Sequence, residues 1–525
     1  MVGPAWGWSS DLGYVSAITD AAPRDSGRIA AICGERVTTW STLLDNAARL
    51  AAALRTFGVM PGDRVAVLAP NSDRYMTLFL AIPWSGGVIV PLNLRWSAGE
   101  NAFALDDSAP KVVFVGGIVD PALSSTFDAR GIRTIDLDDS GRPGWTPWSA
   151  LLTHVPVDDA GRKGDDLFGI FYTGGTTGRS KGVMLSHAGF AGNCATMRAI
   201  GIMPDADRRM LVVAPLFHLA AIAVATVAMQ AGAAVVIAPA FDPDGTLDLI
   251  AREKVTDALL VPTMIQMMLN APGFDARKLS NVRSIIYGAS AIAEATLDGI
   301  MMAAPHVDFF QAYGMTEVSC TATILEPEFH RGVHREAGRH RGAGRPMPGV
   351  EMRIVDSKGR GVPDGGVGEV LVRGPGVMLG YWGQPELTAA AVRDGWMHTG
   401  DGGRFDDAGV LHIVDRMKDM IVSGGENVYS TEVEGAISLH PDVAQCAVIG
   451  VPDERWGERV HAVIVPRSAA LTAEAVISHC RSLIANYKCP RSIEFKPTLP
   501  LSAVGKILKT ELRAPYWSGH TRNIA

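Results

Sequence analysis

The stretch 172–182 reads Tyr-Thr-Gly-Gly-Thr-Thr-Gly-Arg-Ser-Lys-Gly and directly follows an apolar run at 167–171. Glycine lets a backbone turn sharply and lets its N–H groups come close to a ligand. The threonine hydroxyls and two cations, Arg179 and Lys181, add the donors and the positive charge that a polyphosphate requires. The stretch is not a P-loop, because Gly182 follows the lysine where that motif has serine or threonine. Alone, such a loop is more often an ordinary turn, so its meaning depends on the rest of the chain.

The composition is that of a packed globular protein with more than one domain. The chain has 525 residues, of which 47% are hydrophobic and 20% are charged. A net charge of −7 argues against a nucleic-acid partner, which clustered cations would have to neutralise. The six cysteines have no Cys-x-x-Cys spacing, which favours reduced thiols in the cytoplasm over disulfides or zinc.

Neither a signal peptide nor a membrane span is expected. Residues 1–10 lack a basic segment followed by an apolar one. The longest uncharged stretch, Leu219–Ala240, is divided by Gln230 and Gly232 into a helix-length part and a strand-like part. Each part is too short to cross a hydrocarbon layer of ~30 Å, so the stretch is expected to be buried core.

Helical and strand-like segments alternate through the first 400 residues or so. Helical apolar spacing covers Thr42–Phe57 and Thr77–Trp84, whereas 64–68, 88–91 and 111–115 have the composition of buried strands. This alternation predicts an α/β fold with layered, largely parallel sheets.

The pattern changes after Val350. Segments 351–356 and 369–373 alternate with period two and predict a small antiparallel unit. From about Asp419 a helix at 430–440 is mixed with strands at 444–450 and 460–465. We therefore expect a large N-terminal domain over 1–415, a hinge at 416–418, and a small α+β domain over 419–525.

Further motifs follow the glycine-rich loop in a fixed order. Residues 311–317 read Gln-Ala-Tyr-Gly-Met-Thr-Glu, and 396–401 read Trp-Met-His-Thr-Gly-Asp. A charged connector, 415–419, precedes Ser-Gly-Gly-Glu-Asn at 423–427, and 499–506 ends in a single lysine. Taken one at a time, these residues have plainer explanations: a core aromatic, a turn aspartate or solvated surface charges. The order of the whole set argues for a shared site.

This set of motifs resembles the adenylate-forming superfamily, which includes acyl-CoA synthetases, peptide-synthetase adenylation domains and beetle luciferases. The resemblance covers about Thr39–Arg513. It implies an enzyme in which a carboxylate attacks the α-phosphorus of ATP and expels pyrophosphate, after which the thiol of CoA takes the acyl group. Phosphoryl chemistry of this kind depends mainly on positioning and charge neutralisation.

Three alternatives stay open beside a CoA ligase. One is an adenylating enzyme that loads a separate carrier protein; no carrier domain follows Lys506, which favours free CoA. Luciferase-type oxidation is a remote alternative. A catalytically silent nucleotide-binding protein is disfavoured by the presence of Thr316, Glu317, Asp401 and Lys506 together.

The resemblance assigns the nucleotide site. The β- and γ-phosphates would be held by Thr173, Gly174, Gly175, Thr176, Thr177, Gly178 and Lys181. The nucleotide site would also include Gly288, Ala289, Ser290, Gln311, Tyr313, Gly314 and Met315. Within it, Tyr313 would stack on adenine, and Asp401 would accept both ribose hydroxyls with Arg416 nearby.

The resemblance also assigns the catalytic groups. Thr316 would contact the α-phosphate, and Glu317 would ligate Mg²⁺, a cation that prefers oxygen ligands. Lys506 would bridge the carboxylate and the α-phosphate. Lys418 would be the hinge about which the C-terminal domain turns between the two half-reactions, and Gly424 and Gly425 would line the path of the thiol.

The acid substrate is expected to be apolar. His218 would lie near the mouth of the acyl pocket, and 219–228 holds no acidic residue to pair the ammonium of an amino acid. Gly314 replaces the tryptophan of acetate-activating members, which predicts an open pocket. The expected walls are apolar or small: Val213, Ala220, Ala221, Met264, Tyr287, Gly288, Ala289, Val318 and Ser319. This suits a fatty, aryl or arylalkanoic acid; the identity of the acid and a homodimer are left open.

Overall fold

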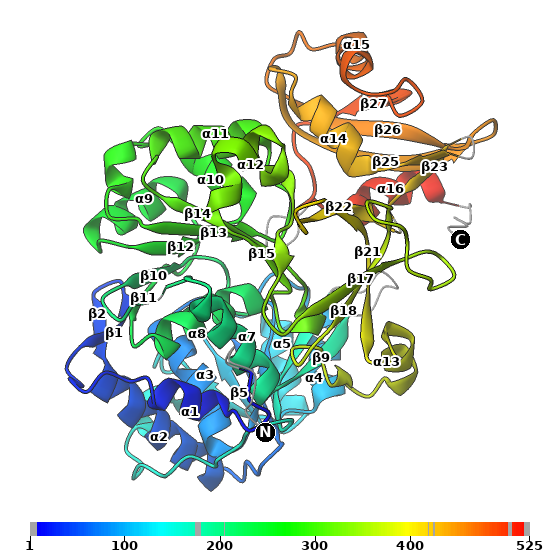
Figure 1. Ribbon diagram of the computed structural model, residues 1–525. Coiled ribbons are helices and arrows are strands. Elements are labelled where there is room, and N and C mark those ends of the chain that lie inside the picture. The colour runs from blue at the N-terminus through cyan, green and yellow to red at the C-terminus, as the bar shows by residue number, and fades with distance from the viewer. Residues whose placement is uncertain are drawn as a thin grey trace.

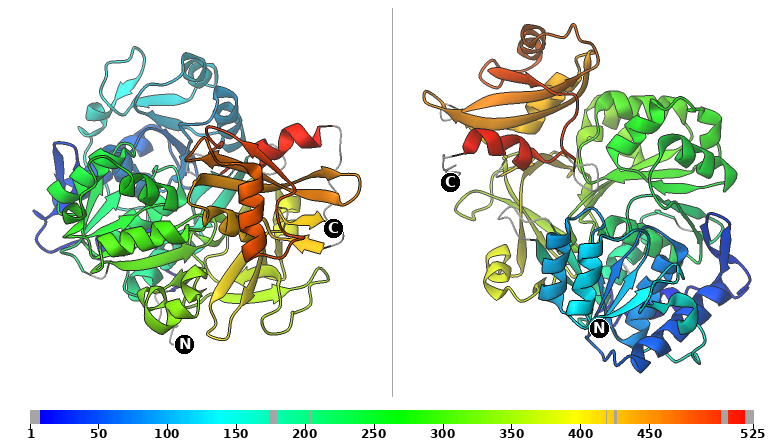
Figure 2. Two further views of the ribbon diagram at one scale, coloured as in Figure 1. Left: turned by 90° about the horizontal axis from the view of Figure 1, so that it is seen from above. Right: turned by 180° about the vertical axis from the view of Figure 1, so that it is seen from behind.

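A computed structural model describes residues 8–173, 180–203, 205–417, 419–423, 426–501 and 507–518. A large N-terminal part carries a smaller C-terminal part at one end (Figure 1). The view from behind in Figure 2 shows the same arrangement. The large part contains two extended sheets with helices around them, followed in the chain by a third, smaller sheet.

The first extended sheet has eight strands and carries both ends of the glycine-rich loop. Its strands, in spatial order, are β19 (Gly380–Tyr381), β9 (Lys181–Ser186), β8 (Leu167–Thr173), β4 (Val88–Pro91), β3 (Arg64–Leu68), β5 (Val112–Val115), β6 (Arg133–Asp136) and β7 (Thr146–Pro147). The strands from β8 to β7 are paired in parallel, whereas β9 is antiparallel to both β8 and β19. The strands expected at 64–68, 88–91 and 111–115 are therefore confirmed as β3, β4 and β5.

The second extended sheet has nine strands. In spatial order they are β16 (Arg345–Pro346), β15 (Thr323–Leu325), β14 (Asp308–Tyr313), β13 (Ser284–Gly288), β12 (Asp257–Leu259), β10 (Arg209–Val212), β11 (Ala234–Ile237), β1 (Ile29–Cys33) and β2 (Arg36–Thr39). The central strands are parallel, and only the edge pairs are antiparallel. This is the largely parallel, layered arrangement that the alternating sequence predicts.

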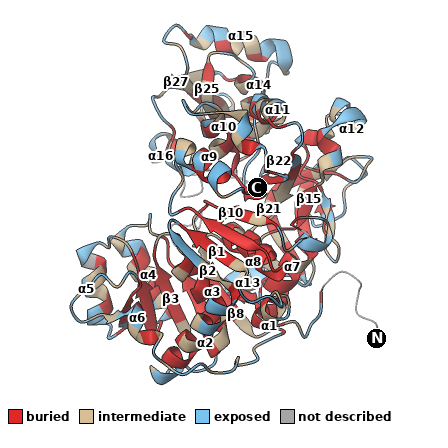
Figure 3. Cartoon of the chain, turned by 90° about the vertical axis from the view of Figure 1, so that its left-hand side faces the viewer, coloured by how far each residue is buried: buried red, intermediate tan, exposed pale blue. Residues whose placement is uncertain are grey.

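Helices cover both faces of both sheets, so the N-terminal part has five layers. Between the sheets lie α1 (Tyr14–Thr19), α2 (Trp40–Thr56), α3 (Asp73–Ser85), α7 (His187–Ala199) and α8 (Leu219–Gln230). Outside the nine-stranded sheet lie α9 (Pro243–Arg252), α10 (Pro262–Leu269) and α11 (Glu294–Ala303). Outside the eight-stranded sheet lie α4 (Ala98–Ser108) and α5 (Pro121–Ala129). In Figure 3 the strands are mostly buried, whereas α5 and α12 (Gly332–Glu336) have exposed surfaces.

The uncharged stretch from Leu219 forms the innermost helix and the strand after it. Nearly every residue of α8 is buried, because the helix is apolar on all sides and lies between the two sheets. It ends at Gln230, and Gly232 turns the chain with φ +67° into β11. The division expected at Gln230 and Gly232 is confirmed, and within the described residues no helix is long and apolar enough to cross a bilayer.

Helix starts differ from expectation where a side chain caps the helix. The helix expected over Thr42–Phe57 begins at Trp40, because the Thr39 hydroxyl accepts a hydrogen bond from the Thr42 N–H. The helix expected from Thr77 begins at Asp73, because Ser72 caps it in the same way. Apolar spacing alone does not reveal such caps, since the capping side chains, Thr39 and Ser72, are polar and precede the helix.

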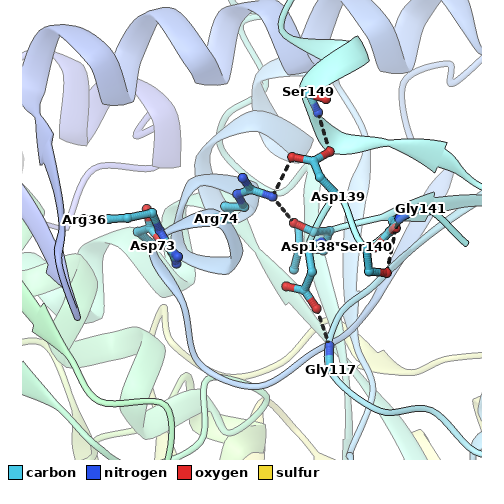
Figure 4. Close-up of polar contacts among 11 residues, drawn as sticks. Arg36, Asp73, Arg74, Gly117, Asp138, Asp139, Ser140, Gly141 and Ser149 are labelled. Atoms are coloured by element: carbon cyan, nitrogen blue, oxygen red, sulfur yellow. Dashed lines mark hydrogen bonds and ion pairs between the residues drawn. The ribbon is translucent and has the colours of Figure 1, made fainter.

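Polar side chains join the loops at the carboxyl edge of the eight-stranded sheet (Figure 4). Arg74, after β3, pairs with Asp139, after β6, at 3.0 Å. Asp138 accepts a hydrogen bond from the Gly117 N–H, after β5, at 2.6 Å. Arg36 of β2 pairs with Asp73 at the start of α3, so these contacts fix the loops and also join the two extended sheets.

The third sheet is antiparallel, as the period-two pattern predicts. It contains β17 (Glu351–Val355), β18 (Gly368–Arg373), β20 (Val392–Arg393), β21 (Trp396–Phe405) and β22 (Leu411–Arg416). Helix α13 (Pro385–Ala391) precedes β20.

The C-terminal part has a sheet and a core of its own. The strands are β23 (Ile421–Ser423), β24 (Glu426–Val428), β25 (Val443–Asp453), β26 (Gly457–Pro466) and β27 (Ser492–Phe495). The helices are α14 (Ser430–Ser438), α15 (Ala473–Leu483) and α16 (Lys509–Trp517). Apolar residues of the sheet pack against α14 and α15 in a core that excludes the N-terminal part.

Two buried histidines have a pKa well below the usual value. Burial lowers the pKa of His187, at the start of α7, to about 4. It lowers the pKa of His330 to the same value. His330 ends the short helix η3 (Pro327–His330), and its Nε2 lies 2.8 Å from the Tyr287 hydroxyl. Each ring is therefore held neutral in the folded chain.

We expect the thermal midpoint of unfolding to fall as pH drops from 6.5 toward 4. Unfolding lets each histidine regain a pKa near 6.5, so protonation below that pH favours the unfolded chain. The loss is about 1.4 kcal/mol per pH unit for each histidine. In His330→Gln the glutamine can still form a hydrogen bond with Tyr287. Differential scanning calorimetry should show that the thermal midpoint of this variant falls less between pH 7 and pH 5 than that of the wild type. An equal fall in both proteins would contradict this account.

Candidate active site

The residues predicted for adenine and ribose meet where the second and third sheets come together. Tyr313 is the last residue of β14, and its hydroxyl donates a hydrogen bond of 2.7 Å to Oδ2 of Asp401 in β21. Arg416, opposite Asp401 in β22, approaches Oδ1 at 3.0 Å. Asp401 is thus buried but paired through both oxygens. Burial and the adjacent carboxylate raise the pKa of Tyr313 well above its usual value, so the phenol stays protonated as the donor.

A shell of hydrogen bonds fixes the backbone around Asp401. Gly400 has φ +70°, which glycine adopts without strain, and its N–H donates to Oε1 of Glu369. The other oxygen of Glu369 lies 2.9 Å from Nδ1 of His398. The Thr399 hydroxyl accepts from the Asp401 N–H and donates to the carbonyl of Val370. This shell orients the carboxylate before any ligand is present.

Glu317 lies three residues beyond Gly314, in the short helix η2 (Thr316–Val318) that follows β14. Its side chain is buried, and its Oε1 accepts a hydrogen bond of 3.0 Å from the Tyr381 hydroxyl. Burial raises the pKa of Glu317, whereas the nearby charges of Arg416 and Lys181 lower it. Thr316, next to Glu317, is half-buried and belongs to the same helix. A partly desolvated carboxylate between two cations suits a metal ligand, because a bound cation would keep it ionised.

The two ends of the glycine-rich loop lie side by side. Thr173 ends β8 and pairs with Lys181, which begins β9. Gly174, Gly175, Thr176, Thr177 and Gly178 lie outside the described residues, as do Lys418, Gly424, Gly425 and Lys506. The roles predicted for these nine residues therefore stay predictions.

The turn after β13 lies next to Tyr313. Gly288 pairs with Ala312 of β14, and a Cβ on Gly288 would come within 2.2 Å of the Ala312 carbonyl oxygen. Only glycine allows the strands to approach so closely at this point. Ala289 follows with φ +66°, so the chain turns at once and Ser290 comes after it. The segment 288–290 is thus brought to the carboxyl end of β14, as the prediction for the nucleotide site requires.

Gly314 has a different explanation from the one expected. A Cβ at this position would lie 2.1 Å from the Cys320 carbonyl oxygen and 2.9 Å from the Thr321 Cα. Glycine is therefore required by the backbone of the following turn, in which Cys320 itself has φ +92°. The interpretation of Gly314 as the opening of the acyl pocket stays a prediction, and the backbone supplies a second reason for glycine at this position. Tryptophan at 314 would displace residues 320 and 321 and would not simply cap a space.

A buried asparagine holds the segment that leads to His218. The Asn71 amide donates to the carbonyls of Ala214 and Ala238, and its oxygen accepts from the Leu216 N–H at 2.7 Å. Asn71 therefore ties a loop of the eight-stranded sheet to two strand ends of the nine-stranded sheet. His218 follows, half-buried, as the residue before α8. Sequence analysis missed Asn71, and only its place directly after the strand 64–68 could have suggested it.

The predicted pocket walls belong to two packing cores. Val213, Met264 and Tyr287 pack in the core outside the nine-stranded sheet. Ala220, Ala221 and Val318 pack in the core between the sheets. The Tyr287 hydroxyl is engaged by His330, so this residue is better explained as a core tyrosine. Reading apolar residues along the sequence could not separate the two faces of one sheet.

An open hollow of about 830 Å³ lies away from this site. Lys111, before β5, and Arg133, at the start of β6, line it with Arg130. Lys111 pairs with Asp63 and Arg130 pairs with Asp106. Ligands of open α/β sheets bind at the carboxyl ends of strands, whereas this hollow lies at the amino ends. We therefore identify the Tyr313–Asp401–Glu317 region as the candidate active site.

Two family profiles and several curated relatives match this chain. The sequence profile of the AMP-binding enzyme family matches residues 18–382, and that of the AMP-binding enzyme C-terminal domain matches residues 432–506. A feruloyl-CoA synthase of Amycolatopsis sp is 38% identical over 490 residues, which cover 91% of this chain and 94% of that protein. The fatty acid–[acyl-carrier-protein] ligase ScoC of Streptomyces coeruleorubidus is 36% identical over 504 residues, covering 94% and 95%.

A solved structure has the same fold. ATP-bound MatB from Rhodopseudomonas palustris superimposes with a TM-score of 0.85 at 30% identity, covering 97% of this chain and 99% of that one. The matched length includes both the N-terminal and the C-terminal parts. The chain belongs to the AMP-binding enzyme family and, within it, to the acyl-CoA ligases of the adenylate-forming superfamily.

Proposed function

We propose that this enzyme uses ATP to convert a fatty, aryl or arylalkanoic acid into an acyl-adenylate and pyrophosphate. It then transfers the acyl group to the thiol of CoA and releases AMP. The observation that carries the proposal is the hydrogen-bonded set Tyr313, Asp401 and Arg416. Glu317 follows four residues after Tyr313, within the electrostatic reach of Arg416 and Lys181.

The first half-reaction would be supported by charges that are already in place. Tyr313 would stack on adenine, and Asp401 would accept the ribose hydroxyls through the lone pairs that Tyr313 and Arg416 leave free. The Gln311 amide oxygen is buried, has no hydrogen-bond partner among the described residues and fits a donor such as the adenine amino group. The acid's oxygen would then bond to the α-phosphorus as the bond to pyrophosphate breaks.

The proposal includes Mg²⁺, which Glu317 would bind. A bound cation would neutralise charge on the phosphates, with Thr173 and Lys181 contributing from the ends of the glycine-rich loop. Thr316 would contact the α-phosphate. Lys506 would meet the carboxylate and the α-phosphate together, and His218 would lie at the entrance for the acid.

The second half-reaction would require the C-terminal part to turn about 416–418, which exposes the adenylate to the thiol along Gly424 and Gly425. In the described arrangement Asp415 accepts a hydrogen bond from the Ser430 N–H across the connector, and such a turn would change this contact. Lys509 joins Ser430 and Glu434 on the C-terminal side. The domain limits 1–415 and 419–525, the cytoplasmic location and a homodimer stay predictions.

A carrier protein is the one alternative to CoA as the acceptor of the acyl group. The relative ScoC is named for a carrier protein, whereas the feruloyl-CoA synthase is named for CoA. We favour CoA, with a carrier protein as the second candidate. Both relatives are named for acids with large apolar parts, which supports the expected acid class.

Asp401→Asn should raise the KM for ATP about tenfold or more and leave the KM for the acid nearly unchanged. The amide cannot replace the negative charge between Arg416 and the ribose, and hydrogen bonds to charged groups are the stronger ones. Steady-state kinetics with each substrate varied would measure this. Glu351→Gln is the matched control, because it breaks an exposed carboxylate–Arg373 pair in the same sheet. A rise in the acid KM alone would contradict the assignment.

Lys506→Ala should slow acyl-adenylate formation ~10²-fold or more, because it removes the positive charge from the developing transition state. Thioester formation from pre-made acyl-adenylate and CoA should largely survive. Rapid-quench measurements of each half-reaction would test this. Equal losses in both would contradict the assignment of Lys506 to the first step alone.

Substrate and acceptor can be tested in one assay series. Fatty acids of increasing length and substituted benzoic, cinnamic and phenylalkanoic acids would be supplied with ATP, and AMP release and CoA consumption followed together. We expect AMP and acyl-CoA in equal amounts with apolar acids, and neither with α-amino acids. Release of AMP without loss of free thiol would favour the carrier-protein candidate.

A further inference from the structure

Tyr381 lies between the glycine-rich loop and Glu317. It ends β19, whose neighbour β9 begins at Lys181, and it pairs with Val183 across that antiparallel ladder. The backbone N–H of the next residue, Trp382, donates a hydrogen bond of 2.7 Å to the Gly182 carbonyl. The backbone of Tyr381 is therefore fixed to the strand that leaves the loop.

The same segment is joined to Glu317 at two points. The Met378 N–H donates to the Glu317 carbonyl at 2.8 Å, which fixes the backbone of η2. The Tyr381 hydroxyl donates to Oε1 of the Glu317 side chain at 3.0 Å, which fixes the carboxylate. Both side chains are buried, Glu317 at 7% and Tyr381 at 6% exposure, so water competes little for this bond.

The ring of Tyr381 also faces the loop lysine. The Lys181 ammonium lies 5.0 Å from the ring centroid, within the range of a cation–π contact. One tyrosine thus contacts a carboxylate through its hydroxyl and a cation through its ring. Glu317 and Lys181 carry opposite charges, and Tyr381 holds them at a defined separation.

We propose that Tyr381 is a positioning residue for the metal–triphosphate unit. Its hydroxyl orients Glu317 toward the cation, and its ring holds Lys181 for the phosphates, so that cation and phosphates bind together. The inference rests on the proposed function, because it takes Glu317 as the Mg²⁺ ligand and Lys181 as a phosphate ligand. Tyr381 itself need not touch ATP.

The test separates the hydroxyl from the ring. Isothermal titration calorimetry would measure ATP binding to the full chain with excess MgCl₂ and again with EDTA. Mg²⁺ should increase the ATP affinity of the wild type, and in Tyr381→Phe this increase should be about tenfold smaller. The reason is that the charged Glu317 carboxylate loses a hydrogen bond. The affinity of Tyr381→Phe in EDTA should stay that of the wild type. Tyr381→Leu should weaken binding in EDTA as well, because Lys181 loses the ring.

The Glu317→Gln variant tests whether Tyr381 acts through Glu317. Glu317→Gln should abolish the gain from Mg²⁺, and adding Tyr381→Phe to it should cause no further loss, because the two residues act through one contact. Tyr516→Phe is the matched control. It removes another tyrosine hydroxyl from a glutamate, Glu494, at 2.9 Å in the C-terminal part, and should change neither affinity.

An unchanged gain from Mg²⁺ in Tyr381→Phe would overturn the proposal. An equal loss of affinity with MgCl₂ and with EDTA is one form of this result, and a general effect on the fold would cause it. If the wild type binds ATP more tightly with Mg²⁺ but forms no acyl-adenylate with any acid, the proposed function fails while this role of Tyr381 stands. A wild type without any gain from Mg²⁺ overturns the role itself.

Discussion

Two buried carboxylates, Asp401 and Glu317, impose the main constraint on the site, because each needs partners that compensate for lost hydration. Asp401 has Tyr313 and Arg416, and Glu317 has Tyr381. These partners come from all three sheets of the N-terminal part: β14 from the nine-stranded sheet, β22 from the third, and β19 from the eight-stranded sheet. The charges can be satisfied only when the sheets are assembled.

The same partners place opposite charges at fixed positions around the predicted nucleotide. Asp401 and Tyr313 lie on the side predicted for ribose and adenine, whereas Glu317 and Lys181 lie on the side predicted for the phosphates. Arg416 links the two, since it pairs with Asp401 and also lowers the pKa of Glu317. Arg416 is the first residue of the proposed hinge, so a turn of the C-terminal part would act directly on this arrangement. Preorganisation of this kind is how enzymes lower the cost of phosphoryl chemistry.

Much of the fold could be predicted from the sequence, because strand and helix periodicity is local. The buried strands 64–68 and 88–91, the central helix from Leu219 and the antiparallel unit after Val350 follow from such patterns. Helix starts are predicted less well, because each depends on one capping hydrogen bond, from Thr39 or Ser72, that apolar spacing does not record.

The site was predictable where its residues are close in sequence and not where they meet through packing. Tyr313, Glu317 and Asp401 stand in recognisable motifs. Tyr381 and Asn71 reach the site only through strand pairing and loop contacts between the sheets. The backbone constraint on Gly314 could not be predicted, because the close approach of Cys320 depends on the fold of the next six residues. The division of the predicted pocket walls between two cores could not be predicted either, because two faces of one sheet have similar composition.

A crystal structure of the enzyme with ATP and Mg²⁺ bound would decide where the nucleotide binds. We expect adenine against Tyr313, the ribose hydroxyls on Asp401, the cation on Glu317, and the terminal phosphates between Thr173 and Lys181. Nucleotide bound elsewhere, for example in the hollow beside Lys111 and Arg133, with Asp401 and Glu317 free of ligand, would contradict it.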